Sequence, residues 1–239
     1  MSVRFEELAW HRTPMGEVSL RRRLDPALRV DVYEVKLDDD FLMSSLFTVA
    51  EVELARLALA AYPGPGNGLD VVVGGLGLGY TACAVLNEPR VGSLTVVEAL
   101  DEVIGWHRDG LLPFATPVTA DRRSRLVHGD FFAMSHGAGF DPDHAGRPFH
   151  VIAVDIDHSP QHVLHPSHAG FYTADGLRHL TRHLHPGGVF ALWSDDPPDA
   201  AFVATLEQVF VRPTAHVVTF ANPVRGGESA NTVYVATAP

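Results

Sequence analysis

The chain has 239 residues, of which 46% are hydrophobic, so it is long enough for one α/β domain with a sizeable core and a short appendage. A net charge of −11 without a basic stripe argues against nucleic-acid binding, and the single cysteine, Cys83, excludes an internal disulfide framework. No N-terminal segment resembles a signal peptide and no apolar run reaches membrane-spanning length, so we expect a cytoplasmic protein that does not act at a membrane.

Residues 1–47 predict a short β appendage. Two runs of strand-forming residues, 17–24 and 28–37, flank the turn signal Asp25-Pro26. This arrangement predicts a β-hairpin.

A helix is expected to follow the appendage. Thr48 and Glu51 have the spacing of a capping box, in which the threonine caps the helix and the glutamate reaches back to the cap. The helix must end at the Pro- and Gly-rich run 62–68, which no helix crosses. We therefore divide the chain into the appendage and a main domain over residues 48–239.

The main domain alternates strands and helices. Strands are predicted near 69–74, 93–98, 124–128, 149–155, 187–194, 214–221 and 231–237. Helices are predicted near 79–88, 101–109, 173–184 and 199–210. Continuous apolar runs in the fourth and fifth strands indicate a sheet that is covered on both faces, and residues 222–228 have hairpin composition. The pattern predicts an α/β fold with a mostly parallel sheet and a C-terminal antiparallel hairpin.

The segment from residue 69 to residue 98 is the most informative part of the sequence. An apolar strand runs into Gly75-Leu76-Gly77-Leu78-Gly79, a helix-compatible run follows, and the next strand ends in Glu98. Glycine permits positive φ and a close approach of the backbone to a ligand, and a carboxylate at the end of the second strand can accept hydrogen bonds from both ribose hydroxyls. This layout is typical of a nucleotide-binding βαβ unit. The alternative is a tight turn that binds nothing.

The remaining candidates also lie at strand ends, because open α/β sheets bind ligands beyond the carboxyl ends of their strands. Each carboxylate has a structural alternative, as a turn or helix cap for the aspartates and as a first-turn helix carboxylate for the glutamate. The candidate residues are Gly75–Gly79, Glu98, Gly129-Asp130, Asp155-Ile156-Asp157 and Ser194-Asp195-Asp196.

Taken together, these strand ends resemble the spermidine synthase family, a branch of the Rossmann-like class I SAM-dependent methyltransferase fold. The similarity covers about residues 37–195. It implies a seven-stranded sheet preceded by a small β domain, which is shortened here, and a homodimer as one expected assembly. The matching segments are Val73–Gly77, Val97-Glu98, Val127–Asp130, Phe149–Asp155 and Leu184–Val189.

The resemblance implies a donor site for S-adenosylmethionine or its decarboxylated form, used as co-substrate. Gly75, Gly77 and Gly79 would shape the loop against the nucleoside and the sulfonium arm. Glu98 would bind the ribose hydroxyls and Asp130 the adenine amino group. A cationic sulfonium agrees with carboxylates around the site.

For the acceptor, the resemblance implies an amine. Asp155 matches the family's catalytic aspartate, which takes a proton from the attacking amine. A second family aspartate falls in register with His158, so Asp157 would take its place only if the loop shifts. We retain Asp155 and Asp157 as the catalytic candidates.

Two departures from the family bear on specificity. Gly77 stands where the family has an aspartate that holds the free amine of the decarboxylated donor, so the carboxylate of ordinary S-adenosylmethionine would not be repelled. The family's glutamine and Tyr-His pair align with Leu42, Glu51 and Val52, and Glu53 is the one match left. Because a polyamine needs carboxylates at several points, these losses argue against putrescine as acceptor.

Three hypotheses follow: transfer of an aminopropyl or related alkyl group to an amine, methyl transfer from S-adenosylmethionine to a small molecule, and nucleoside binding without catalysis. Four histidines near the catalytic candidates leave open a further choice, between a histidine-rich lid and a metal site. Pro160 and Pro166 break any regular helix there, which favours the lid and no metal. The histidines are His158, His162, His165 and His168.

Overall fold

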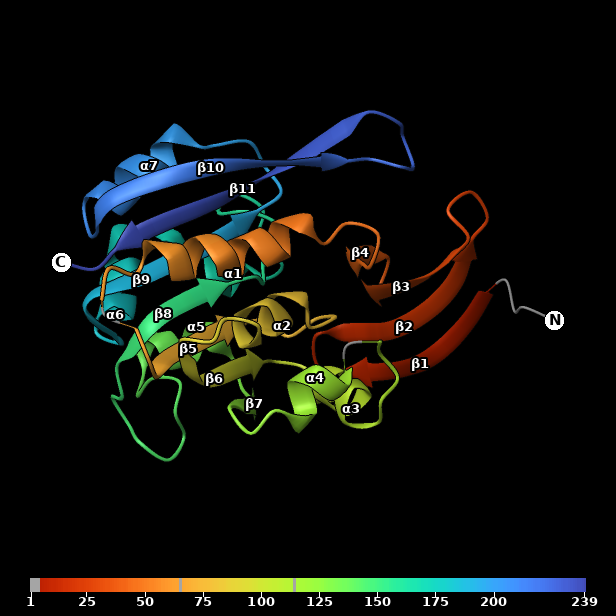
Figure 1. Cartoon of the computed structure of the whole chain (residues 1–239), viewed down its shortest axis with the longest axis horizontal. Coiled ribbons are helices and arrows are strands. Elements are labelled where there is room, and N and C mark those ends of the chain that lie inside the picture. Colours follow the sequence, from red (N-terminus) through yellow and green to blue (C-terminus); the bar gives the residue numbers. More distant parts are fainter. Residues whose placement is uncertain (1–4, 65, 114) are drawn as a thin grey trace.

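The computed structural model describes residues 5–64, 66–113 and 115–239 (Figure 1). Residues 1–4 of the predicted appendage and Pro65 of the predicted 62–68 linker lie outside the described residues. None of the described helices has both the length and the apolar character needed to cross a membrane.

The N-terminal region forms a four-stranded antiparallel sheet in the order β1-β2-β3-β4. Its strands are β1 (Phe5–Thr13), β2 (Gly16–Asp25), β3 (Val30–Leu37) and β4 (Asp40–Ser44). The predicted hairpin corresponds to β2 and β3, and a further strand pairs with each of them. Strand β1 was not predicted. Most of its side chains are exposed, so its sequence does not show the alternation of apolar and polar residues that indicates a strand.

Helix α1 (Val49–Ala61) begins and ends where predicted, but the predicted capping box is wrong. The Thr48 side chain makes no cap hydrogen bond, and its backbone (φ −132°, ψ 4°) is not in the extended conformation of an N-cap. Glu51 instead faces a cavity, which is described below. Buried side chains such as Leu54 and Ala58 pack the helix against β8, β9 and β11 of the main sheet.

The main sheet has seven strands in the order β10-β11-β9-β8-β5-β6-β7. They are β5 (Leu69–Gly74), β6 (Val91–Glu98), β7 (Ser124–His128), β8 (Phe149–Val154), β9 (Leu184–Ser194), β10 (Val211–Ala221) and β11 (Glu228–Thr237). Strand β11 runs antiparallel to both of its neighbours, and the remaining pairs are parallel. The predicted seven-stranded, mostly parallel sheet with a C-terminal antiparallel hairpin is confirmed.

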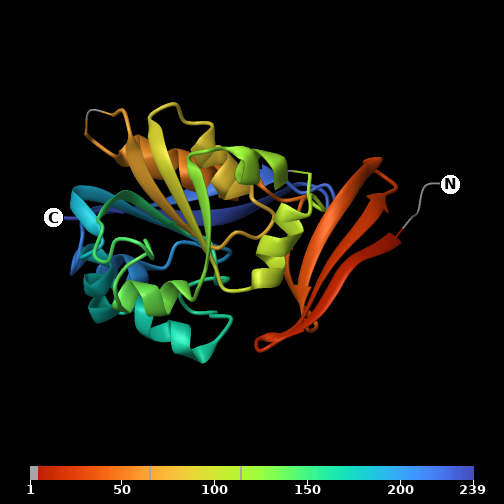
Figure 2. The same ribbon diagram turned by 90° about the horizontal axis from the view of Figure 1, so that it is seen from below.

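Helices cover both faces of this sheet (Figure 2). On one face, α1 is joined by α2 (Tyr80–Leu86), α3 (Asp101–Arg108) and α4 (Ala115–Ala120). On the other lie α5 (Phe131–His136), the 3₁₀ helix η1 (Pro166–Tyr172), α6 (Ala174–Thr181) and α7 (Ala200–Glu207). Along β5, Val71 and Val73 enter one core cluster and Val72 the other, which explains why buried strands read as continuous apolar runs. Helices α4, α5 and η1 are too short to show a periodic pattern and were not predicted.

The parallel strands point their carboxyl ends toward the N-terminal sheet (Figure 1). Strand order reverses at β5, which pairs with β6 on one side and with β8 on the other. A ligand crevice is therefore expected beyond β5 and β8, beneath the N-terminal sheet.

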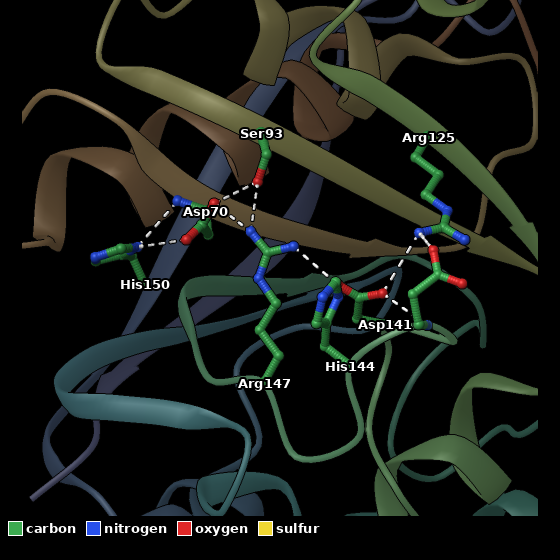
Figure 3. A network of polar contacts seen from close by, with 8 residues as sticks. Asp70, Ser93, Arg125, Asp141, His144, Arg147 and His150 are labelled. Carbon is green, nitrogen blue, oxygen red and sulfur yellow. Dashed lines mark hydrogen bonds and ion pairs between the residues drawn. The ribbon is translucent and has the colours of Figure 1, made fainter.

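At the opposite, amino-terminal edge, ion pairs connect four strands (Figure 3). Arg147, just before β8, contacts Asp70 of β5 at 2.7 Å and Asp141 at 2.9 Å. Asp141 also contacts Arg125 of β7 at 3.4 Å, and Asp70 accepts a hydrogen bond from Ser93 of β6. The carboxylates at this edge are thus paired with cations.

We expect Asp141→Asn to lower the free energy of unfolding at neutral pH by about 2 kcal/mol. Burial opposes ionisation of Asp141, but hydrogen bonds from Arg147, the Asp143 backbone and His144 outweigh it and lower the pKa to about 2. Because the folded pKa lies below the unfolded value of about 4, this stabilisation is present above about pH 4 and is lost as the pH falls toward 2.

Urea unfolding over a pH series measures this contribution. The matched control is Asp143→Asn, because Asp143 also pairs with Arg125 but its side chain is 63% exposed, and it should change stability little. An unchanged pH dependence in Asp141→Asn would contradict the assigned pairing.

Gly75 allows β5 and β8 to approach each other where the chain leaves the sheet. Its φ is +92°, and its N–H donates to the Val97 carbonyl at 2.9 Å. A Cβ at this position would overlap the backbone oxygen of Asp155. The position therefore requires glycine for two reasons, backbone conformation and space.

We expect Gly75→Ala to cost about 3 kcal/mol of unfolding free energy, because the residue becomes strained and must displace rigid backbone. Gly110→Ala is the control: its φ is +71° but no atom lies within 4 Å of the added Cβ. It should cost only the conformational part, about 1 kcal/mol. If urea unfolding gave the same loss of free energy for Gly75→Ala and Gly110→Ala, the close approach of the two strand ends would not be rigid.

Candidate functional site

A cavity of about 1390 Å³ opens at the carboxyl ends of the parallel strands. Its wall includes Met43 of β4, the glycine loop after β5, and the loop between β10 and β11. Typical small-molecule sites measure about 300–1,000 Å³, so this cavity has room for a nucleoside together with a second small molecule.

Six of the seven predicted site residues line this cavity, and one does not. Asp157 is the exception. Those that line it are Gly75, Gly77, Gly79, Glu98, Asp130 and Asp155.

Glu98 joins the end of β6 to the glycine loop. Its Oε2 accepts a hydrogen bond from the Leu76 N–H at 3.0 Å, and its Oε1 accepts one from the Leu100 N–H at 2.9 Å. Burial raises the pKa of Glu98 against the opposing effect of these backbone donors. The backbone N–H groups of Gly77 and Ala99 also act on this carboxylate and oppose the effect of burial.

The glycine loop is held from two sides. Gly77 has φ +46°, and a Cβ there would lie 2.5 Å from the sulfur of Met43. The same sulfur accepts a hydrogen bond from the Leu78 N–H at 3.1 Å. From the other side, Nε2 of buried His107 donates to the Gly77 carbonyl at 2.8 Å, and burial lowers the pKa of this histidine. The Met43 thioether therefore fills the space that a side chain at position 77 would need.

Asp130 caps α5. Its Oδ1 accepts hydrogen bonds from the backbone N–H groups of Phe132 at 2.9 Å and Ala133 at 3.1 Å. The helix-cap alternative from the sequence therefore applies to one oxygen of this residue. The residue also lines the cavity, so a capping role and a ligand role are compatible.

Asp155 lies at the end of β8 beside a second carboxylate that the sequence did not assign. The Thr81 hydroxyl donates to Asp155 Oδ2 at 2.8 Å and lies 3.4 Å from the Glu51 carbonyl oxygen. Burial raises the pKa of Asp155 to about 6 against the hydrogen bond from Thr81. Burial and repulsion by Asp155 raise the pKa of Glu51 to about 8.

Asp157 is turned away from the cavity and its side chain is fully buried. Its Oδ1 accepts from the Leu164 N–H at 2.7 Å and lies 2.9 Å from His168 Nδ1, while its Oδ2 accepts from the Tyr172 hydroxyl at 2.8 Å. The loop shift that a catalytic role requires does not occur. Asp157 anchors the histidine segment, and we do not retain it as a catalytic residue.

The histidine segment forms part of the cavity wall through His158, His165 and His168. His168 stacks on Phe132 with ring centroids 4.0 Å apart. Across the described residues, no group of three or more His, Cys, Asp or Glu side chains is arranged to hold a metal ion. Three of the four histidines of this segment therefore contribute to the cavity wall.

The charge of the cavity is strongly unbalanced. Within the described part of the chain, five carboxylates and one arginine, Arg225, line it. This excess suits cationic ligands. The carboxylates are Glu51, Glu98, Asp130, Asp155 and Asp195.

Sequence reasoning missed Glu51 and Met43 as residues of the site. For Glu51 a signal existed, because it occupies the register of the family's tyrosine, but the capping-box pattern gave a simpler explanation. For Met43 no local signal existed, since only the fold brings β4 to the glycine loop.

No protein-family model matches the sequence. Among solved structures, a spermidine synthase from Thermotoga maritima superposes with a TM-score of 0.72 at 18% identity, covering 97% of this chain and 72% of that one. A spermidine synthase in complex with the transition-state analogue AdoDATO superposes with a TM-score of 0.71 at 18% identity, covering 97% of this chain and 72% of that one. A probable spermidine synthase from Corynebacterium glutamicum superposes with a TM-score of 0.65 at 16% identity, covering 97% of this chain and 79% of that one. The chain therefore has the fold of the spermidine synthases, as its motifs predicted.

Proposed function

We propose that this protein transfers an aminopropyl or related alkyl group from an adenosyl sulfonium donor to an amine, with Asp155 as the base. The observation that carries the proposal is the convergence of the glycine loop, Glu98, Asp130 and Asp155 on one cavity with an excess of carboxylates. Donor and acceptor are both cations, so this excess favours the binding of each.

On the donor side, the Glu98 carboxylate, which lines the cavity at the end of β6, accepts the ribose hydroxyls. Asp130 Oδ1 is occupied by the α5 backbone, which leaves Oδ2 to accept from the adenine amino group. The glycine loop lets the backbone approach the sulfonium arm. One structurally similar spermidine synthase is in complex with the transition-state analogue AdoDATO, which supports a donor site of this kind.

In the transfer step, the acceptor ammonium first gives a proton to Asp155. The neutral amine then attacks the carbon next to sulfur, so that an N–C bond forms and the C–S bond breaks. The bonding pair leaves on sulfur as a neutral thioether, and the positive charge passes to the product amine. Asp155 is suited to this role because its pKa of about 6 leaves it ionised at neutral pH, and the Thr81 hydroxyl orients it.

One observation favours methyl transfer as a second candidate. Position 77 carries no carboxylate, and Arg225 lines the same cavity. An arginine can pair with the carboxylate of ordinary S-adenosylmethionine, which the decarboxylated donor lacks. Donor preference therefore separates the two reactions.

Calorimetry with three ligands tests the donor site. For an alkyl transferase we expect decarboxylated S-adenosylmethionine and methylthioadenosine to bind more tightly than S-adenosylmethionine. Tighter binding of S-adenosylmethionine would favour methyl transfer instead. Tight binding without turnover on a panel of amines and hydroxyl compounds would favour a protein that binds the nucleoside without catalysis.

Glu98→Ala should weaken methylthioadenosine binding by about tenfold or more, because two hydrogen bonds to a charged acceptor are lost. Glu88→Gln is the control, since Glu88 pairs with Arg90 and does not line the cavity. Melting temperatures of both variants check that the fold is retained. Unchanged affinity in Glu98→Ala would refute the nucleoside assignment.

Asp155→Asn should lower kcat by about 10²-fold or more while methylthioadenosine still binds. In the wild type, kcat/KM should fall as the pH drops below about 6, because the base becomes protonated. Rates measured from acid to neutral pH test this sign. A profile that stays flat through this range would exclude Asp155 as the base.

A further inference from the structure

We propose that Glu51 is a substrate-binding residue that, together with Asp155, forms a carboxylate pair holding the ammonium group of the acceptor. This inference rests on the proposed function and extends it to the acceptor. It assigns the acceptor as a primary amine that enters the site through one charged end.

The position of Glu51 places it on the acceptor half of the cavity. Helix α1 packs against α2 and over β8, β9 and β11, whereas Glu98 and Asp130 follow β6 and β7 on the other side of β5. Glu51, in the first turn of α1, therefore lies on the β8 side of the cavity with Asp155. The Thr81 hydroxyl, 2.8 Å from Asp155 Oδ2 and 3.4 Å from the Glu51 carbonyl oxygen, bridges the two elements.

The pair lacks a cation from the protein. In residues 5–64, 66–113 and 115–239, no lysine, arginine or histidine nitrogen lies within 4.0 Å of either carboxylate. Two partly buried carboxylates without a counter-charge repel each other and are costly to ionise together. A cationic group between them removes both penalties, and an ammonium offers three N–H donors for the purpose.

The other groups that face Glu51 are neutral. Tyr80, from α2, lies close enough that Glu51 contributes to raising its pKa, after burial as the larger cause. Its hydroxyl bonds to Ser45. Thr81 contributes only a hydroxyl, so Asp155 is the charged group that acts on Glu51 among residues 5–64, 66–113 and 115–239. The titration of Glu51 is therefore controlled by its burial and by Asp155.

Protonation of the pair fits the transfer step. Because the two carboxylates repel each other and burial raises the pKa of both, the pair is expected to hold one shared proton near neutral pH. A bound ammonium favours ionisation of Glu51 as well, so that both carboxylates contact the cation. After the amine has given one proton to the pair and attacked carbon, the product departs as a secondary ammonium and that proton passes to solvent.

Glu53 provides a matched control on the same helix. Glu53 is the residue of this segment that matches the family in sequence, but in the structure it pairs with Arg56 on the protein surface and does not line the cavity, so it has no place in the proposed acceptor site. A general effect of removing a carboxylate from α1 would therefore appear in Glu53→Gln as well. Glutamine keeps the size of the side chain in both variants.

The experiment follows the ¹³C carboxyl resonances of Glu51 and Asp155 in the full chain with methylthioadenosine bound, as n-butylamine is added. The resonances are assigned with Glu51→Gln and Asp155→Asn. We expect the amine to lower the pKa of Glu51 from about 8, and the half-saturating amine concentration to rise about tenfold or more in Glu51→Gln. In Glu53→Gln, the half-saturating amine concentration should stay within about twofold of the wild-type value.

Two results would overturn the inference: a Glu51 resonance that does not respond to the amine up to about 100 mM, or equal half-saturation in the two glutamine variants. Methylthioadenosine binding is read separately in the same samples. Failure of the nucleoside to bind would refute the proposed function itself, whereas normal nucleoside binding with an indifferent Glu51 would refute the acceptor assignment alone.

Discussion

The site depends on the close approach of two neighbouring strand ends. Strands β5 and β8 leave the sheet side by side, and the backbone oxygen of Asp155 occupies the space where a side chain at position 75 would lie. Because Gly75 has none, the chain can leave β5 with a positive φ while the Asp155 backbone keeps its place. The glycine loop and Asp155 are thus positioned by one close approach of two backbones.

The carboxylates at the two edges of the main sheet differ in whether a cation of the protein pairs with them. At the amino edge, Asp70 and Asp141 are paired with arginines, so their charges are neutralised within the protein. At the carboxyl edge, Glu51 and Asp155 are partly buried without a cation from the described residues, and their pKa values rise. Paired carboxylates stabilise the fold, whereas unpaired ones destabilise it and are retained where a ligand supplies the missing charge.

The sheet could be predicted from the sequence because burial on both faces produces unmistakable apolar runs. Strands β5 and β7 have the predicted bounds, and the glycine loop and the carboxylate of β6 lie where their motif places them. The role of Glu51 could not be predicted in the same way, since Thr48 and Glu51 satisfy the spacing of a capping box. Spacing does not reveal that the Thr48 backbone departs from the conformation of a helix N-cap.

Asp157 is a second residue whose role could not be predicted from its position in the sequence. An aspartate two residues after the base, at a strand end, has the position of a second catalytic carboxylate. Its side chain is nevertheless occupied by Leu164, His168 and Tyr172, which lie 7 to 15 residues further along the chain. Only the folded path of that segment decides between a ligand contact and an anchor.

Gly77 and Met43 suggest how the charge of the cavity has been redistributed relative to the family that the sequence resembles. A side chain at position 77 would meet the Met43 thioether, so an aspartate there would require Met43 to move. The cavity has no carboxylate at that position but has one at position 51, where the family has a tyrosine. Under the proposed function, this distribution would make the pocket for the donor arm less selective for an amine and the acceptor pocket more selective for one.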